Sequence, residues 1–122
     1  MEELKILAPC GILGYGYPKE SFMRGMKEKP NAIIVDAGST DAGPHKLGAG
    51  VAIVSRQACK KDLEIMITEG AKANIPVIIG SAGGSGGKVH VEWTWSIIQE
   101  IFKRKSFRKF KNSSYLGGYF KR

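Results

Sequence analysis

The sequence predicts an α/β domain with a short parallel sheet, on two observations. Three apolar runs rich in Ile and Val, at residues 4–8, 32–36 and 76–80, are continuous rather than alternating, as in strands buried on both faces. Segments with helical spacing of apolar residues separate them. Such alternation is typical of parallel strands joined by right-handed crossovers. We therefore predict a three-layer, Rossmann-like partial domain with strand order 2-1-3 and helices on both faces.

Two helices are predicted between the strands. The first occupies about residues 18–29 and has Pro18 where a first helical turn tolerates proline. The second begins at Ser55, whose hydroxyl suits an N-cap position, and runs to about Ala73. Apolar residues at helical spacing predict one buried stripe on this helix, formed by Cys59, Leu63, Met66, Ile67 and Gly70.

A third helix is predicted after the last strand, from about His90 to Phe102. Two lines of apolar residues run along it and include Trp93 and Trp95. Core packing explains this spacing better than stacking on a bound ring. Residues 49–55 are a candidate for one additional short strand.

The net charge of +8 belongs to the C-terminal tail. Residues 1–102 contain all 11 Asp and Glu and 11 of the 19 Lys and Arg, so that part is neutral and residues 103–122 carry the whole excess. We therefore divide the chain into an α/β domain at 1–102 and a basic tail at 103–122. A basic domain face would indicate nucleic acid, whereas here nucleic-acid binding would depend on the tail alone.

The remaining composition favours a cytoplasmic protein. No apolar run is long enough to cross a bilayer, so we expect no membrane span. The N-terminus begins with two acidic residues, unlike a signal peptide. Cys10 and Cys59 make neither a disulfide framework nor a cysteine metal cluster.

Glycines and polar residues collect in three loops that each follow a predicted strand. Residues 1–102 hold 14 of the 16 glycines, most of them in CGILGYGYP, DAGSTDAGPHKLGAG and GSAGGSGG. The carboxyl ends of parallel strands share one edge of the sheet, and ligands of open α/β folds bind there. The three loops therefore predict a binding site at that edge.

The third loop, residues 80–87, predicts an anion site. Glycine permits positive φ and lets amide hydrogens face a phosphate or carboxylate beside the start of the next helix. The spacing does not match the dinucleotide fingerprint, which needs G-x-G-x-x-G after the first strand. It does not match a P-loop either, because Val89 follows Lys88 where Ser or Thr is required. A flexible turn is the alternative. The candidate binding residues of this loop are Gly80, Ser81, Gly83, Gly84 and Lys88.

The first loop contributes Cys10 and Gly11 as candidate binding residues. Its glycines are spaced G-x-x-G-x-G, the reverse of the dinucleotide pattern, so nicotinamide binding is a minor alternative. Cys10 could act as a nucleophile, but a lone cysteine without a known partner is more often inert packing.

The segment after the second strand holds most of the candidate catalytic residues. Asp36 ends the strand, Asp41 and His45 follow closely, and His90 could approach from the third helix. Carboxylate and imidazole together suit base and acid chemistry or a divalent metal, although no H-E-x-x-H spacing specifies one. Capping of turns is the alternative role of these side chains. Two neighbours are candidate ligand contacts, Ser39 and Thr40.

Four segments in order make residues 4–102 resemble a known family. They are LAPCGILGYGYP, VDAGSTDAGPHKLG, VSRQACKKDLE, and PVIIGSAGGSGG followed by HVEWT. The chain resembles the N-terminal region of the acyclic terpene utilisation proteins. That resemblance implies a longer catabolic enzyme for branched acyclic terpenoids, with acyl-CoA thioesters as intermediates. It also implies one shared site containing Asp36, Ser39, Thr40, Asp41, Gly43, Pro44, Ser81, Gly83, Gly84 and His90.

The tail departs from this pattern. A family member would continue into a fourth strand, whereas KRKSFRKFKNSSYLGGYFKR has no acidic residue and no convincing strand pattern. We hypothesise that residues from about 103 onward are a frameshift product or degenerate end of a larger enzyme. A genuine basic extension that contacts RNA, DNA or an anionic membrane surface is the alternative. Open sheet edges would favour a homo-oligomer or association with a missing C-terminal half.

The sequence thus predicts an enzyme-type domain that binds a small anionic organic molecule, such as a carboxylate, phosphate or acyl-CoA. Asp36 or Asp41 would be the general base, and His45 or His90 the acid or a metal ligand. A non-catalytic ligand-binding or regulatory module and a nucleic-acid-binding tail are the alternatives.

Overall fold

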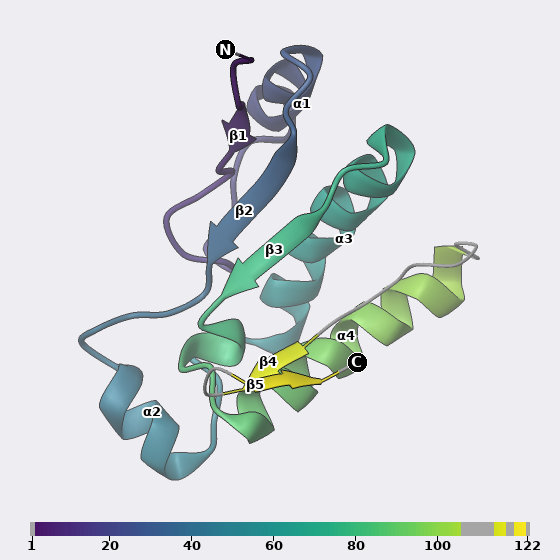
Figure 1. Cartoon of the computed structure of the whole chain (residues 1–122). Helices are drawn as coiled ribbons and strands as arrows, with labels where there is room; N and C mark the ends of the chain where they lie inside the picture. Colours follow the sequence, from purple (N-terminus) through teal and green to yellow (C-terminus); the bar gives the residue numbers. More distant parts are fainter. Residues whose placement is uncertain (1, 106–113, 117–118, 122) are drawn as a thin grey trace.

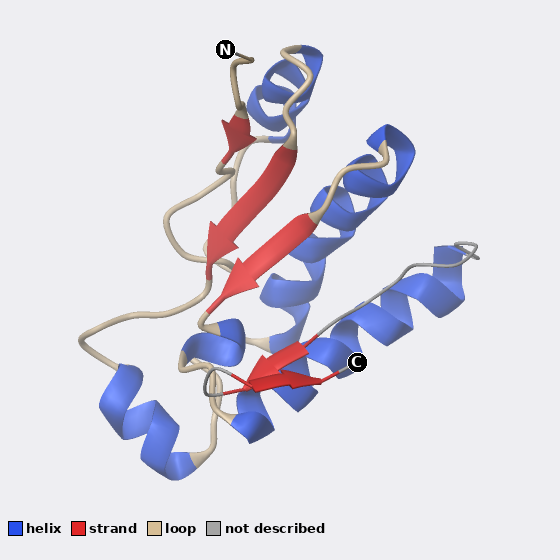
Figure 2. Ribbon diagram, viewed as in Figure 1, coloured by secondary structure: helices blue, strands red, loops and turns tan. Residues whose placement is uncertain are grey.

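The computed structural model describes residues 2–105, 114–116 and 119–121, and confirms an α/β fold (Figures 1 and 2). The elements in chain order are β1 (Ile6–Leu7), α1 (Lys19–Lys27), β2 (Ala32–Asp36), α2 (Gly43–Ala49), α3 (Arg56–Ala73), β3 (Val77–Gly80), the short 3-10 helix η1 (Ala82–Gly84), α4 (Lys88–Lys105), β4 (Ser114–Leu116) and β5 (Tyr119–Lys121). No helix in the described part of the chain is long and apolar enough to cross a membrane.

The sheet is parallel, but its strand order is 1-2-3, so the predicted order 2-1-3 is wrong. β2 lies in the centre: Ile6 of β1 pairs with Ala32, and Asp36 at the end of β2 pairs with Gly80 of β3. The chain therefore moves in the same direction across the sheet at both crossovers. Right-handed crossovers that advance in one direction place their helices on the same face.

The prediction of helices on both faces is accordingly wrong, since α1 and α3 lie on one face of the sheet (Figure 1). Ile33 and Val35 of β2 point to this face and are buried. The alternate residues point the other way, and there Ile6 and Ile78 remain 53% and 50% exposed. One face of this parallel sheet is thus packed and the other is open.

The core forms between the packed face and the helices. α1 contributes Phe22, and α3 contributes the predicted stripe, all five residues of which are buried. α4 packs on α3 through Ile97 and Ile101, both fully buried. The expected core role agrees with the structure for Trp93, which packs against the core. The Trp95 ring meets Phe102 edge-on at 6.1 Å.

Ion pairs on the outer surface also join α3 to α4. Glu100 accepts from Arg56 at 3.0 Å and lies 3.6 Å from Lys60, and the Arg56 hydrogen bond is the main cause that lowers the pKa of Glu100. Glu64 of α3 lies within 4 Å of Arg104 and Lys105. These pairs connect exposed ends of side chains, so each contributes little stability but helps to fix the angle between the helices.

Several element bounds differ from the prediction. α1 begins one residue after Pro18, which occupies the N-cap, and α4 is longer at both ends than the predicted helix. α2 was not predicted, because its seven residues GPHKLGA bury no side chain and show no apolar stripe. Residues 51–54 form no strand, so the proposed extra strand is also wrong.

The basic tail contains two strands that the sequence did not predict. β4 and β5 pair antiparallel as a separate two-stranded sheet, with Tyr115 opposite Phe120. Residues 106–113, 117, 118 and 122 lie outside the described residues. The frameshift and nucleic-acid hypotheses for the tail therefore stay predictions.

Ser55 was predicted to cap α3, and its Oγ accepts a hydrogen bond from the Ala58 amide at 3.2 Å. We expect Ser55→Ala to lower the free energy of unfolding by about 1 kcal/mol, because one first-turn amide then loses its acceptor. Urea denaturation measures this change. Ser21→Ala is the matched control, because Ser21 is exposed within α1 and caps no helix; equal losses in both variants would contradict the capping role.

Candidate functional site

The carboxyl edge of the sheet brings the second and third loops together. Asp36 and Gly80 are partners at the ends of β2 and β3. Asp36 Oδ1 accepts a hydrogen bond from the Gly38 amide at 2.8 Å, which turns the chain away from the strand. Gly38 lies so close to Ser81 that a Cβ on Gly38 would be 2.6 Å from the Ser81 Cβ. Asp36, Gly80 and Ser81 are therefore neighbours, as expected for this edge.

An open depression of about 540 Å³ extends from this edge onto the uncovered face of the sheet. Four of the predicted site residues line it: Cys10, Gly11, Asp36 and Gly80. The rest of its wall is apolar and includes Ile6, Ile34 and Ile78. The depression thus combines one carboxylate with an apolar floor.

The glycine-rich third loop is tightly folded. Ser81, Gly83, Gly84 and Gly86 all have positive φ, between 48° and 108°. The Gly84 amide donates to the Ser81 carbonyl at 2.9 Å, and the Gly86 amide donates to the Ala82 carbonyl at 3.1 Å. These two amides, which were predicted to bind an anion, therefore form hydrogen bonds within the loop itself.

Close packing also explains two of these glycines. A Cβ on Gly83 would lie 2.6 Å from the His90 carbonyl oxygen, and a Cβ on Gly84 would lie 2.6 Å from Ile53 Cγ1. Both glycines are buried. A ligand was predicted to approach the backbone closely here. At Gly83 and Gly84 the group that approaches is another part of the protein.

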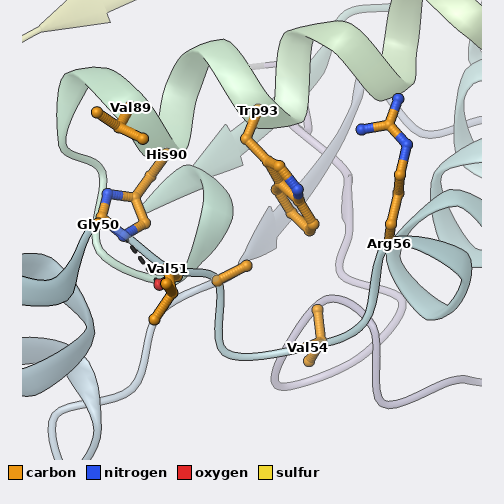
Figure 3. A pocket seen from close by; sticks show the side chains of 8 residues that line it. Gly50, Val51, Val54, Arg56, Val89, His90 and Trp93 are labelled. Carbon is orange, nitrogen blue, oxygen red and sulfur yellow. Dashed lines mark hydrogen bonds between the residues drawn. The ribbon is translucent and has the colours of Figure 1, made fainter.

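His90 is buried, with 3% of its surface exposed, and it belongs to a different pocket (Figure 3). Its Nε2 lies 3.0 Å from the Val51 carbonyl oxygen and 3.1 Å from that of Lys46, so Nε2 carries the hydrogen and donates it. Nδ1 is buried beside Gly87 and makes no hydrogen bond within the described residues. His90 thus ties the end of α2 and the next loop to the first turn of α4.

The pocket at His90 has a volume of about 390 Å³ and lies between residues 50–56 and α4 (Figure 3). Val51 and Val54 form one side, and Trp93 forms the other. Arg56 lies at one end of the pocket, where its guanidinium donates to Ser96 Oγ and Glu100. The single site that the sequence predicted is thus divided between two separate depressions.

The other predicted site residues line neither depression. Thr40, Asp41 and His45 are exposed, and His45 lies on α2. The carbonyl of Ser39 accepts from the Gly43 amide at 2.8 Å, and Lys88 pairs with Glu92 on the surface of α4. The remaining residues of the expected family site, Gly43 and Pro44, form the start of α2, where the Gly43 carbonyl accepts from Ser85 Oγ.

Asp62 is a buried carboxylate that the sequence analysis missed. It lies on α3, is 3% exposed, and its Oδ2 accepts from the amides of Gly14 and Gly16 at 2.8 and 3.0 Å. Its own carbonyl accepts from the Tyr17 hydroxyl. The buried carboxylate therefore fixes the glycine-rich first loop. The sequence did contain one signal of its burial, because Asp62 directly precedes Leu63 of the predicted buried stripe.

The environment of the two cysteines favours the protonated thiol. Burial, and then the negative charge of Asp62, raise the pKa of Cys10 and raise that of Cys59 to about 11. The same causes raise the pKa of Tyr17. Both cysteines are free thiols. A nucleophilic cysteine needs a lowered pKa, so Cys10 fits the packing alternative better than the catalytic one.

Metal binding has no preformed ligand cluster in residues 2–105 and the described strands of the tail. No group of three or more His, Cys, Asp and Glu side chains gathers there. Comparisons of the chain with family models, curated proteins and solved structures find no significant match.

The raised pKa of Cys59 predicts a loss of stability in alkali. Because the folded pKa lies above the unfolded value of 9.0, the stabilising contribution is complete below pH 9 and disappears as the pH rises through about 11. The loss amounts to roughly 2 to 3 kcal/mol. Urea denaturation from pH 8 to pH 11 should show a shallower fall for Cys59→Ala than for the wild type, whereas parallel curves would contradict the assignment.

Gly83→Ala should lower the free energy of unfolding by at least about 2 kcal/mol. The substitution forces a Cβ onto the His90 backbone at a residue with φ of 72°. Gly48→Ala is the control, because Gly48 lies within α2, its Cβ would meet no atom within 4 Å, and alanine favours a helix. Thermal unfolding compares the two variants; a neutral Gly83→Ala would show that the third loop is not held against α4.

Proposed function

We propose that this chain is the α/β ligand-binding part of a catabolic enzyme of the acyclic terpene utilisation type. Its ligand is an anionic organic molecule, a carboxylate, a phosphate or an acyl-CoA thioester, at the carboxyl edge of the sheet. The observation that carries this proposal is the meeting of Asp36, Gly80 and Ser81 at one edge, beside a depression with an apolar floor. A branched acyl chain suits that floor, and a polar head group suits the edge.

Within this proposal Asp36 is the general base. It is exposed at the end of β2 and lines the depression, and its turn-forming hydrogen bond uses Oδ1, which sets the direction of the carboxylate. The third loop begins beside Asp36, where Ser81 packs against Gly38, and in this proposal the amides of that loop without an internal acceptor hold the anionic group. His90 keeps its Nε2 on two backbone carbonyls, so we assign it the positioning of α4 rather than proton transfer.

The second candidate function is a non-catalytic ligand-binding or regulatory module. Its specific support is that Asp36 and His90 both make structural hydrogen bonds, and that Cys10 is held as a thiol. The same ligand classes would bind, but none would be consumed. We also propose a cytoplasmic location for either function, because both cysteines are free.

Thermal shift with CoA, a branched short-chain acyl-CoA and AMP tests the binding proposal. A ligand at one hundred times its dissociation constant stabilises the fold by about 2.7 kcal/mol, which raises Tm by roughly 5 to 10 °C. Repeating the assay with EDTA and with Mg²⁺ or Zn²⁺ separates the candidates, because metal-dependent stabilisation favours the enzyme and metal-independent stabilisation the module. No shift with any of the three ligands would contradict both.

Asp36→Asn then tests the catalytic role. We expect the variant to keep its Tm and its ligand-induced shift, and to consume the stabilising ligand at least 100-fold more slowly than the wild type, as measured by mass spectrometry. Glu28→Gln is the matched control, since Glu28 is exposed at the opposite end of the sheet, after α1. Unchanged consumption by Asp36→Asn would remove Asp36 from the mechanism.

A further inference from the structure

The first loop, residues 11–17 between β1 and α1, has little apolar packing of its own. Leu13 is its one buried side chain, whereas Tyr15 and Gly16 are exposed. β1 ends at Leu7, so pairing with β2 does not hold the residues that follow. Polar contacts therefore set where this loop lies.

Two amides of the loop converge on one oxygen of Asp62. Gly14 and Gly16 donate to Asp62 Oδ2 at 2.8 and 3.0 Å, and their φ angles are 101° and 87°. Glycine adopts such angles readily and other residues rarely do. Backbone amides that converge in this way form an anion site. The anion here is a side chain of the protein itself, because Asp62 is only 3% exposed and belongs to α3.

A third amide links the loop to the end of β2. The Leu13 amide donates to the Asp36 carbonyl at 2.9 Å, and Leu13 directly precedes Gly14. On its other side Asp36 pairs with Gly80 of β3. The position of Asp36 thus depends on two neighbours, and one of them is held in place from α3.

The same loop borders the depression at the carboxyl edge. Cys10 and Gly11, just before it and at its start, line the depression together with Asp36. After burial, the negative charge of Asp62 is the second cause that raises the pKa of the Cys10 thiol. Asp62 therefore acts on the wall of the depression although it does not line it.

We propose that Asp62 is a positioning residue of the candidate site, the internal anion of the Gly14 and Gly16 amides that holds the first loop against Asp36. Removal of its carboxylate opens an anion site that takes a small carboxylate such as formate. That Asp36 belongs to a working site rests on the proposed function, whereas the hold of Asp62 on the loop does not.

Amide hydrogen exchange, resolved by residue with NMR, tests this hold. We expect the Leu13 amide of Asp62→Ala to exchange at least about 10-fold faster than in the wild type, because two loop amides lose a charged acceptor. The acceptor of Leu13 itself, the Asp36 carbonyl, is unchanged in this variant. The Ile33 amide, which donates to the Pro76 carbonyl at 3.0 Å, is the reference for global unfolding.

Two further variants make the exchange experiment decisive. Asp62→Asn keeps the shape and one acceptor oxygen, so its Leu13 amide should be accelerated less than that of Asp62→Ala. Glu20→Ala removes an exposed carboxylate from α1 and should leave Leu13 at the wild-type rate. Equal acceleration of Leu13 and Ile33 in both Asp62 variants, or an unchanged Leu13 in both, overturns the proposal.

Sodium formate tests the anion site. We expect it to return the Leu13 exchange rate of Asp62→Ala to within about threefold of the wild-type rate, because a free carboxylate then accepts from the two amides. Asp62→Asn fills the site with its own oxygen and should not respond. A formate effect that is absent in Asp62→Ala, or equal in the two variants, overturns the internal-anion role.

Calorimetric titration with a branched short-chain acyl-CoA tests the link to the candidate site. Asp62→Ala should bind at least about 10-fold more weakly than the wild type, and formate should restore the affinity, while Glu20→Ala binds normally. Wild-type affinity in Asp62→Ala overturns the positioning role. A wild type that binds none of this ligand contradicts the proposed function instead, and the Leu13 exchange rates still decide whether Asp62 holds the loop.

Discussion

The handedness of the two crossovers determines the form of this molecule. Both connections advance across the sheet in the same direction, from β1 to β2 and from β2 to β3. Because β-α-β units are right-handed, this order places α1 and α3 on one face. The core forms there, around Ile33 and Val35, and the other face keeps its isoleucines in solvent. The open depression and the uncovered face of the sheet are both consequences of this strand order.

Local signals in the sequence were sufficient for the elements but not for their arrangement. The N-cap at Ser55, the end of α3 at Ala73 and its buried stripe follow from side-chain chemistry within one helix. The strand order depends on which of two edges the third strand joins, and the apolar runs at 32–36 and 76–80 contain no residue that distinguishes those edges. A parallel strand that is open on one face carries the same continuous apolar pattern as one that is covered on both.

The candidate site was predictable in part for a similar reason. That Asp36 and Gly80 would meet follows from their places at the ends of parallel strands. His90 lies apart from Asp36 because its imidazole binds a backbone carbonyl of α2. The sequence did not predict α2, since this short helix has no apolar stripe. Asp62 was missed because it follows two lysines, a pattern that predicts a solvent-exposed carboxylate. The structure shows that it accepts hydrogen bonds from the amides of Gly14 and Gly16.

The shortness of β1 has a consequence for how the chain opens. Ile6 and Leu7 are its only two residues paired with β2, and β1 is an edge strand. The loop that follows is held far more firmly, by Asp62 and by the Leu13 amide on the Asp36 carbonyl at 2.9 Å. We therefore expect the first residues of the chain, up to about residue 12, to open locally more readily than the core between α1, α3 and β2. Amide hydrogens there would then exchange through such openings rather than through global unfolding.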